Sequence, residues 1–304
     1  MKLSKTQANL VLTLTAIIWG SGYIFTKMAT NAAMPAGLIN AFRGLIFALL
    51  VYIFFRKTVR KMNRREFVVG LTAGVINLIA YQLQTISMQY TTPADNAFLT
   101  ATYIVMIPFI VWLVFREAPA PKSYIAIIIC MFGVMVLTGV VSHGFHFQFG
   151  DMLVLLSALF YAIQIVYFSS TAATISPWIT AFMLGMVQGF GGLLISVLTE
   201  THAYAAIDWR AGLLPVIILG VLSSFGAQSL QLIGQKFTDP TPAGLIMMTE
   251  SVFGSIFSVM FGFEKFTANL LIGGLIILVA IVLMQIDFRR LIVSWRRRRA
   301  HADQ

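Results

Sequence analysis

Residues 90–117 read YTTPADNAFLTATYIVMIPFIVWLVFRE, and they can be laid without a gap over FTDPTPAGLIMMTESVFGSIFSVMFGFE at 237–264. Three matched pairs lie at one constant spacing of 147 residues: Pro93 and Pro240, Thr102 and Thr249, and Glu117 and Glu264. Overall identity between the two stretches is low, so the alignment needs support from the rest of the chain. It indicates that the sequence is built from two related halves.

The composition predicts that these halves lie in a membrane. The chain has 304 residues, of which 59% are hydrophobic and 11% charged, whereas a globular protein has about 45–50% apolar residues. Apolar runs of about 20 residues, each long enough to cross a hydrocarbon layer of about 30 Å, recur along the chain. We therefore expect an all-α membrane protein with ten transmembrane helices, at 9–27, 35–55, 67–88, 94–114, 122–141, 150–169, 177–198, 212–235, 241–261 and 267–287.

The basic residues cluster beside the apolar runs, as in RKTVRKMNRR (56–65) and WRRRR (295–299). Such clusters mark cytoplasmic loops and contact anionic lipid headgroups. The distribution fits an even number of spans in a prokaryotic cytoplasmic membrane, with both termini cytoplasmic. The net charge of +10 does not indicate nucleic-acid binding, because the spans leave no soluble domain to carry it.

Polar residues form matching stripes in the two halves. Asn77, Tyr81 and Gln84 fall at i, i+4 and i+7 in the third span, and Ser224, Gln228 and Gln231 repeat them 147 residues later in the eighth. Thr15 and Trp19 share a face of the first span, as Ser157, Tyr161 and Gln164 do in the sixth. Residues at these spacings occupy one side of a helix. The stripes either hydrogen-bond to neighbouring helices or line a wet cavity, and their aromatic members favour the cavity.

Two five-helix halves in one membrane must run antiparallel, because five is odd. The sequence thus predicts two inverted five-helix repeats at 1–145 and 146–290, followed by a basic cytoplasmic tail at 291–304. Secondary transporters with this plan bind substrate near the middle of the membrane, between the repeats.

Glu250 interrupts an apolar run, where an ionised carboxylate is unfavourable by at least about 2.5 kcal/mol. The repeat pairs it with Tyr103, so the halves differ at this point. Three interpretations stay open: an ion pair with Arg43, contact with a substrate ammonium, and transport of a coupling proton. The role of Arg43 is equally open: it either pairs with Glu250 or binds a substrate carboxylate.

Enzyme motifs such as H-E-x-x-H, G-x-S-x-G and the phosphate-binding loop are absent from the sequence. We therefore expect no enzyme, no cofactor and no direct use of ATP. His143 and His146 are too few to predict a metal site, since the sequence offers them no further ligand beyond Asp151.

The chain resembles the EamA-type family of the drug/metabolite transporter superfamily over about residues 9–287. The resemblance rests on IIWGSGYIFTK (17–27), Arg43, the FRE that ends at Glu117, and TESVFGSIFSVMFGFEKFTANLLIGGLIILVAIVL (249–283). The family often has proline after the intramembrane glutamate, and Ser251 stands there in this chain. The resemblance implies a ten-helix carrier whose first, third, fourth, sixth, eighth and ninth helices surround a central cavity, and which exports amino acids, related metabolites or drug-like compounds.

We therefore predict a secondary transporter that exports a small organic metabolite by alternating access. The expected substrate-binding residues are Trp19, Arg43, Tyr81, Gln84, Tyr103, Tyr161, Gln164, Gln228, Gln231 and Glu250. The expected partners are a small-molecule substrate, membrane lipids and, in one interpretation of Glu250, protons; no oligomeric state is predicted. The alternatives are an importer or exchanger of another metabolite class and a non-transporting membrane receptor.

Overall fold

The computed structural model describes residues 3–116, 118, 121–137, 148–171, 174–238 and 240–285. Within these ranges the chain is helical and forms no strand, which confirms the all-α prediction. Glu117, His143, His146 and the basic tail at 291–304 lie outside the described residues.

The helices follow one another along both halves of the chain. The first half contains α1 (Lys5–Asn31), α2 (Ala36–Val59), α3 (Arg64–Ser87), α4 (Pro93–Ala101), α5 (Tyr103–Phe115) and α6 (Pro121–Leu137). The second contains α8 (Phe149–Thr171), α9 (Pro177–Thr199), η1 (Thr201–Ala206), α10 (Trp209–Ile218), η2 (Leu219–Gln228), α11 (Ser229–Gln235), α12 (Pro240–Met248), α13 (Glu250–Met260) and α14 (Ala268–Gln285). In the described part, seven helical stretches are long and apolar enough to cross a membrane, and three apolar helices are shorter. The chain is thus a multi-pass membrane protein.

Several helix starts are encoded locally. Ser4 precedes α1, where its side chain accepts from the Gln7 amide while the Gln7 side chain accepts from the Ser4 amide. Asn63 and Glu66 form the same reciprocal cap before α3. These caps satisfy backbone N–H groups that have no partner inside the helix.

Two spans are broken at positions that the sequence alignment pairs. Thr102 separates α4 from α5, and Thr249 separates α12 from α13. In both cases the threonine hydroxyl donates to the carbonyl oxygen three residues earlier at 2.6 Å, a side-chain bond that bends a helix. The breaks make Tyr103 and Glu250 the first residues of α5 and α13.

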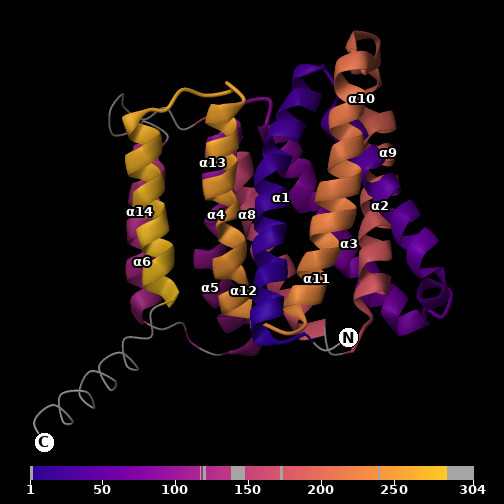
Figure 1. The fold of residues 1–304 in the computed structure, drawn as a ribbon, viewed down its shortest axis with the longest axis horizontal. Helices are drawn as coiled ribbons and strands as arrows, with labels where there is room; N and C mark the ends of the chain where they lie inside the picture. Colours follow the sequence, from indigo (N-terminus) through magenta and orange to yellow (C-terminus); the bar gives the residue numbers. More distant parts are fainter. Residues whose placement is uncertain are drawn as a thin grey trace, which may run out of the picture.

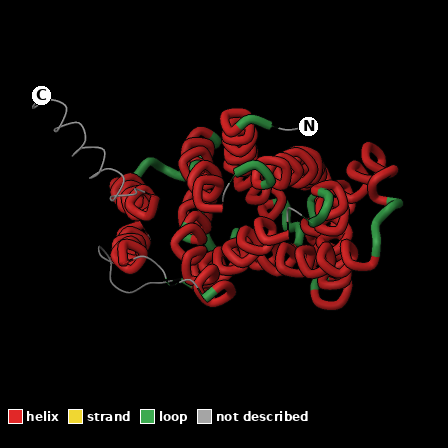
Figure 2. Tube along the Cα trace, turned by 90° about the horizontal axis from the view of Figure 1, so that it is seen from below, coloured by secondary structure: helices red, strands yellow, loops and turns green. Residues whose placement is uncertain are grey.

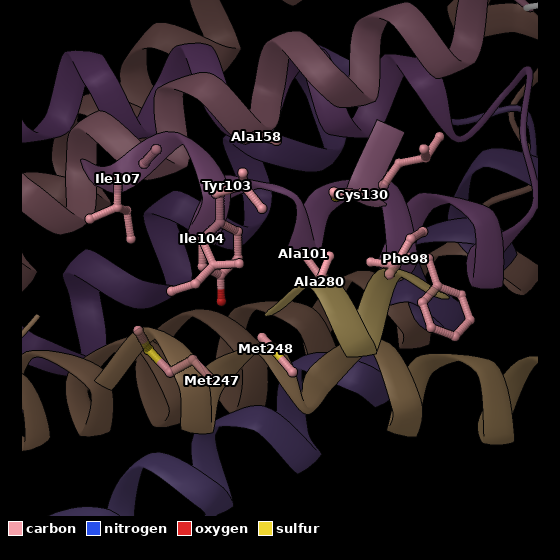
Figure 3. Packing of buried hydrophobic residues seen from close by; sticks show 14 of the residues in the cluster. Phe98, Ala101, Tyr103, Ile104, Ile107, Cys130, Ala158, Met247, Met248 and Ala280 are labelled. Carbon is pink, nitrogen blue, oxygen red and sulfur yellow. The ribbon is translucent and has the colours of Figure 1, made fainter. Parts of the chain in front are cut away.

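The helices pack in pairs drawn from different halves. α2 lies against α9, α3 against α8, α4 against α13, and α6 against α14 (Figure 1). The α6–α14 pair forms one edge of the molecule (Figure 2), and α1 packs against α13, α10 and η2. Figure 3 shows part of the largest apolar cluster, in which residues of α4 and α5 meet Met247 and Met248 of α12 and Ala280 of α14.

Glycines allow α2 and α9 to touch through their backbones. A Cβ atom added to Gly44 would lie 2.3 Å from the amide nitrogen of Gly189, and one added to Gly185 would lie 2.6 Å from that of Ala48. Small residues permit such approach between membrane helices. The G-x-x-x-G spacing of Gly185 and Gly189 therefore serves packing within the chain.

Glu264 follows α13, outside the membrane-spanning helices, and ties two helix ends together. Its carboxylate accepts from the Thr92 hydroxyl at the start of α4 at 3.2 Å and from the Ser258 hydroxyl in α13 at 3.3 Å. Burial raises the pKa of Glu264 above its ordinary value, although both hydrogen bonds act to lower it.

A raised carboxyl pKa in the folded protein makes stability fall as pH rises, because the folded state then holds a proton that the unfolded state has lost. We expect the melting temperature of the purified protein to decrease as the pH is raised from the ordinary glutamate pKa to the raised one. Glu264→Gln should show a smaller fall over the same pH range. Identical pH profiles of melting temperature for the two proteins would contradict this assignment.

Candidate functional site

A cavity lies where the two broken spans meet α1, α2, α3, α8, η2 and α11. Its cavity volume is about 40 Å³, within a wider space of about 550 Å³ that includes open solvent. Nine of the ten residues predicted to bind substrate line it: Trp19, Arg43, Tyr81, Gln84, Tyr103, Tyr161, Gln164, Gln231 and Glu250. The tenth, Gln228, lies just behind the wall, where its side chain contacts Tyr81 and Asn77.

Arg43 is held at the cavity wall by the π-helical segment η2. Its Nε donates to Ser224 Oγ at 3.0 Å and its Nη2 to Ser223 Oγ at 3.3 Å. The guanidinium carbon lies 4.2 Å from the centre of the Tyr81 ring, within the range of a cation–π interaction. Arg43 is 2% exposed, so these neutral groups surround a buried positive charge.

Glu250 lies in the first turn of α13 and is 4% exposed. The Tyr23 hydroxyl donates to its Oε1 at 3.5 Å, a long hydrogen bond. Among the described residues no ion pair joins Glu250 to Arg43, although both line the cavity. The ion-pair interpretation is therefore not realised in this conformation, and the two ionisable side chains face one space separately.

Aromatic rings and amides line another part of the cavity, next to Arg43. The Tyr81 and Tyr161 rings meet edge to face, with centroids 5.5 Å apart. The Tyr161 hydroxyl donates to Gln84 Oε1 at 2.9 Å, and Gln84 Nε2 donates to Thr100 Oγ1 at 3.0 Å. These contacts link α8, α3 and α4, and they fix the direction of each polar group at the cavity surface.

Asn77 joins the two halves through its side chain. Its Oδ1 accepts from Gln164 Nε2 at 2.6 Å and from Gln228 Nε2 at 2.9 Å. Within the part of the chain that the structure describes, its own Nδ2 is buried without a partner, as is the Tyr103 hydroxyl. Unpaired buried groups cost about 1–3 kcal/mol each. Of the two, Tyr103 lines the cavity, so its hydroxyl is available to a ligand or to water.

Eight lining residues were not predicted from sequence, and the side chains of three of them hydrogen-bond to predicted residues. Tyr23 lies one turn after Trp19 on the same face of α1, so the i, i+4 spacing could have identified it. Thr100 is the partner of Gln84, and Ser223 is a partner of Arg43. No sequence signal distinguishes these hydroxyls, because serine and threonine are common in apolar helices.

The geometry predicts a stability effect at Ser224. Ser224→Ala removes the partner of a buried guanidinium nitrogen, and we expect the melting temperature to fall by about 5 °C, from a loss of about 1–3 kcal/mol. Ser255→Ala is the matched control, because the Ser255 hydroxyl only donates to the Ser251 carbonyl of its own helix. Equal melting temperatures for the two variants would show that Ser224 does not hold Arg43.

Comparison with known proteins identifies relatives over nearly the whole chain. An "Uncharacterized transporter" of Archaeoglobus fulgidus is 28% identical over 280 residues, which cover 92% of this chain and 86% of the relative. "Uncharacterized transporter YvbV" of Bacillus subtilis is 29% identical over 294 residues, with 93% of each protein covered.

A solved crystal structure has the same fold, with a TM-score of 0.69 at 18% identity, covering 95% of this chain and 99% of the other. The EamA-like transporter family matches the chain in two segments, residues 6–139 and 148–286. Together these segments include every residue that lines the central cavity. The chain belongs to the EamA-like transporter family.

Proposed function

We propose that this transporter exports small organic metabolites, such as amino acids or drug-like compounds, by alternating access. The observation that carries the proposal is the separate presence of Arg43 and Glu250 at one cavity, each buried and neither paired with the other. A zwitterion supplies both missing partners, because its carboxylate and its ammonium complement a guanidinium and a carboxylate.

Two inverted five-helix repeats, at 1–145 and 146–290, would provide the moving parts. The matched breaks at Thr102 and Thr249 support this plan, as does the match of the family to two separate segments. The helix contacts support it too, because equivalent helices make equivalent contacts. The contact between α2 and η2 corresponds to that between α9 and α3, and the contact between α1 and η2 corresponds to that between α8 and α3. Exchanging the halves would therefore preserve the packing, as rocking between two equivalent states requires.

The ten predicted substrate-binding residues divide into three roles under this proposal. Trp19, Tyr81, Tyr103 and Tyr161 offer flat walls, while Gln84, Gln164, Gln228 and Gln231 orient polar groups. Arg43 and Glu250 bind the charged ends. Because intramembrane ionisable groups also serve as proton relays, Glu250 alternatively carries a coupling proton.

We place the protein in the cytoplasmic membrane with both termini in the cytoplasm. The basic segment at 56–65 supports this orientation, since basic loops remain on the cytoplasmic side. Lipids are then the surrounding solvent. The exposed apolar side chains along the helices, such as Leu113, Leu198 and Met260, support this location.

Release from liposomes tests the proposed function. Purified protein is reconstituted, the vesicles are loaded with one common amino acid at a time, and release is compared with that from protein-free vesicles. We expect release of at least one compound to depend on the protein. A second panel of drug-like amines extends the test, and no protein-dependent release in either panel would contradict the proposal.

A further inference from the structure

A second, smaller pocket lies near the end of α11. Helix α11 ends, and α1 begins, at the bottom of Figure 1. The pocket is formed between α8, α9 and α11, and its lining includes Phe168, Thr171, Thr180, Leu232 and Gln235. Among its described lining residues none is charged. Its cavity volume is about 20 Å³, enough for one or two water molecules or a small polar group.

Gln235 is a polar side chain in a largely apolar pocket. Its side chain is 4% exposed, it lines the pocket, and neither its Nε2 nor its Oε1 has a hydrogen-bond partner among the described residues. Of ten buried side-chain atoms without a partner in the described chain, five belong to residues 229–238. A buried amide is normally paired, so a polar partner that enters only in another state would explain this concentration.

The two pockets are neighbours along two helices. On α11, Gln231 lines the central cavity and Gln235, one turn further, lines the second pocket. On α8, Ile165 lines the cavity and Phe168 lines the pocket. One helical turn is about 5.4 Å, so only a thin layer separates the two spaces.

The separating layer is apolar. Phe168 and Leu232 are 3% and 7% exposed and belong to one cluster of packed hydrophobic side chains. Gln231 and Gln235 stand on either side of it, on one face of α11. An apolar closure between two spaces that both carry polar side chains is a barrier that a modest helix movement would open.

We propose that the pocket at Gln235 is a second subsite on the substrate path, which Phe168 and Leu232 close off from the central cavity in this conformation. The proposal rests on the transport function above. The subsite fits uncharged groups that donate and accept hydrogen bonds, such as a hydroxyl or an amide, because its polar lining is a glutamine and two threonines. The charged ends of a substrate would remain at Arg43 and Glu250.

Thiol labelling tests the subsite without a known substrate. Cys130 is the only cysteine of the chain, so Cys130→Ala gives a background for single cysteines at Gln235 and, as a second position in the same pocket, Thr180. Ala181→Cys is the matched control, since Ala181 neighbours Thr180, is 0% exposed and belongs to the apolar cluster. Lys236→Cys, at an exposed position, reports the accessible membrane side.

The probe is a membrane-impermeant sulfonated methanethiosulfonate, which needs a hydrated thiolate to react. We expect Gln235→Cys and Thr180→Cys to react from the same side as Lys236→Cys, and at least about tenfold faster than Ala181→Cys, through transient opening of the pocket. Labelled Gln235→Cys should also lose flux of the panel compound that the liposomes release fastest, whereas labelled Lys236→Cys should keep it.

The subsite is overturned if both pocket positions are labelled as slowly as Ala181→Cys, even when the protein transports a panel compound. Labelling of Gln235→Cys that leaves flux intact overturns it as well. Absence of flux from every variant and from the wild type instead contradicts the transport function, so the two failures are distinguishable.

Discussion

Replacing Glu250 by glutamine is expected to reduce flux about tenfold to a hundredfold, because a hydrogen bond to a charged group contributes about 1.5–3 kcal/mol. The carboxyl group is buried at the cavity, and among the described residues only the long contact from Tyr23 Oη reaches it. Glutamine keeps the size of the side chain and removes its charge. The fold should therefore persist, which an unchanged melting temperature would establish.

The same variant separates the two remaining interpretations of Glu250. If Glu250 binds an ammonium group, Glu250→Gln slows both net release and one-for-one exchange of an amino acid. If it carries a coupling proton, the variant loses accumulation driven by a pH gradient but retains exchange, because exchange requires no net proton movement. Glu264→Gln is the control, since Glu264 is a partly buried carboxylate outside the cavity. Normal flux by both routes in Glu250→Gln would remove Glu250 from the site.

The helical periodicity of the sequence was enough to predict most of the cavity wall. Tyr81 and Gln84 share a face of α3, and Trp19 and Tyr161 face the same space from other helices. This inference needs only regular α-helices with 3.6 residues per turn. It worked because α1, α3 and α8 are unbroken over those positions.

Gln228 shows where periodicity was insufficient. It belongs to the π-helix η2, whose i→i+5 bonding places more residues in each turn than an α-helix has. Its equivalent in the first half, Tyr81, lies in a regular α-helix. The altered turn gives Gln228 contacts with Asn77 and Tyr81 behind the wall, and propensity alone gives no reason to expect a π-helix there.

The pattern of apolar residues also could not predict the helix breaks at Thr102 and Thr249. Threonine is common inside helices, and its effect depends on whether the hydroxyl bonds back to the chain. The alignment did pair the two positions, which is why the matched breaks support the repeat. Arg43 was recognised as a buried charge, but its partners lie on a helix about 180 residues away, a contact that only the packed structure reveals.

Gly44→Ala is expected to lower the melting temperature by about 5–10 °C, because overpacking a tight contact costs about 1–3 kcal/mol. The new methyl group would lie 2.3 Å from the Gly189 backbone, so α2 and α9 must move apart. Side chains can rotate out of a clash, but a backbone amide in a neighbouring helix cannot.

The displacement should also reach the cavity, because Arg43 directly precedes Gly44 and is held by Ser223 and Ser224 of η2. We therefore expect Gly44→Ala to lose flux at temperatures well below its own melting point. Gly226→Ala is the matched control, since the nearest atom to its added Cβ is 3.4 Å away and alanine is the better helix former. Normal melting and flux in Gly44→Ala would mean that α2 and α9 are less closely packed than their glycines indicate, and that the position of Arg43 does not depend on their contact.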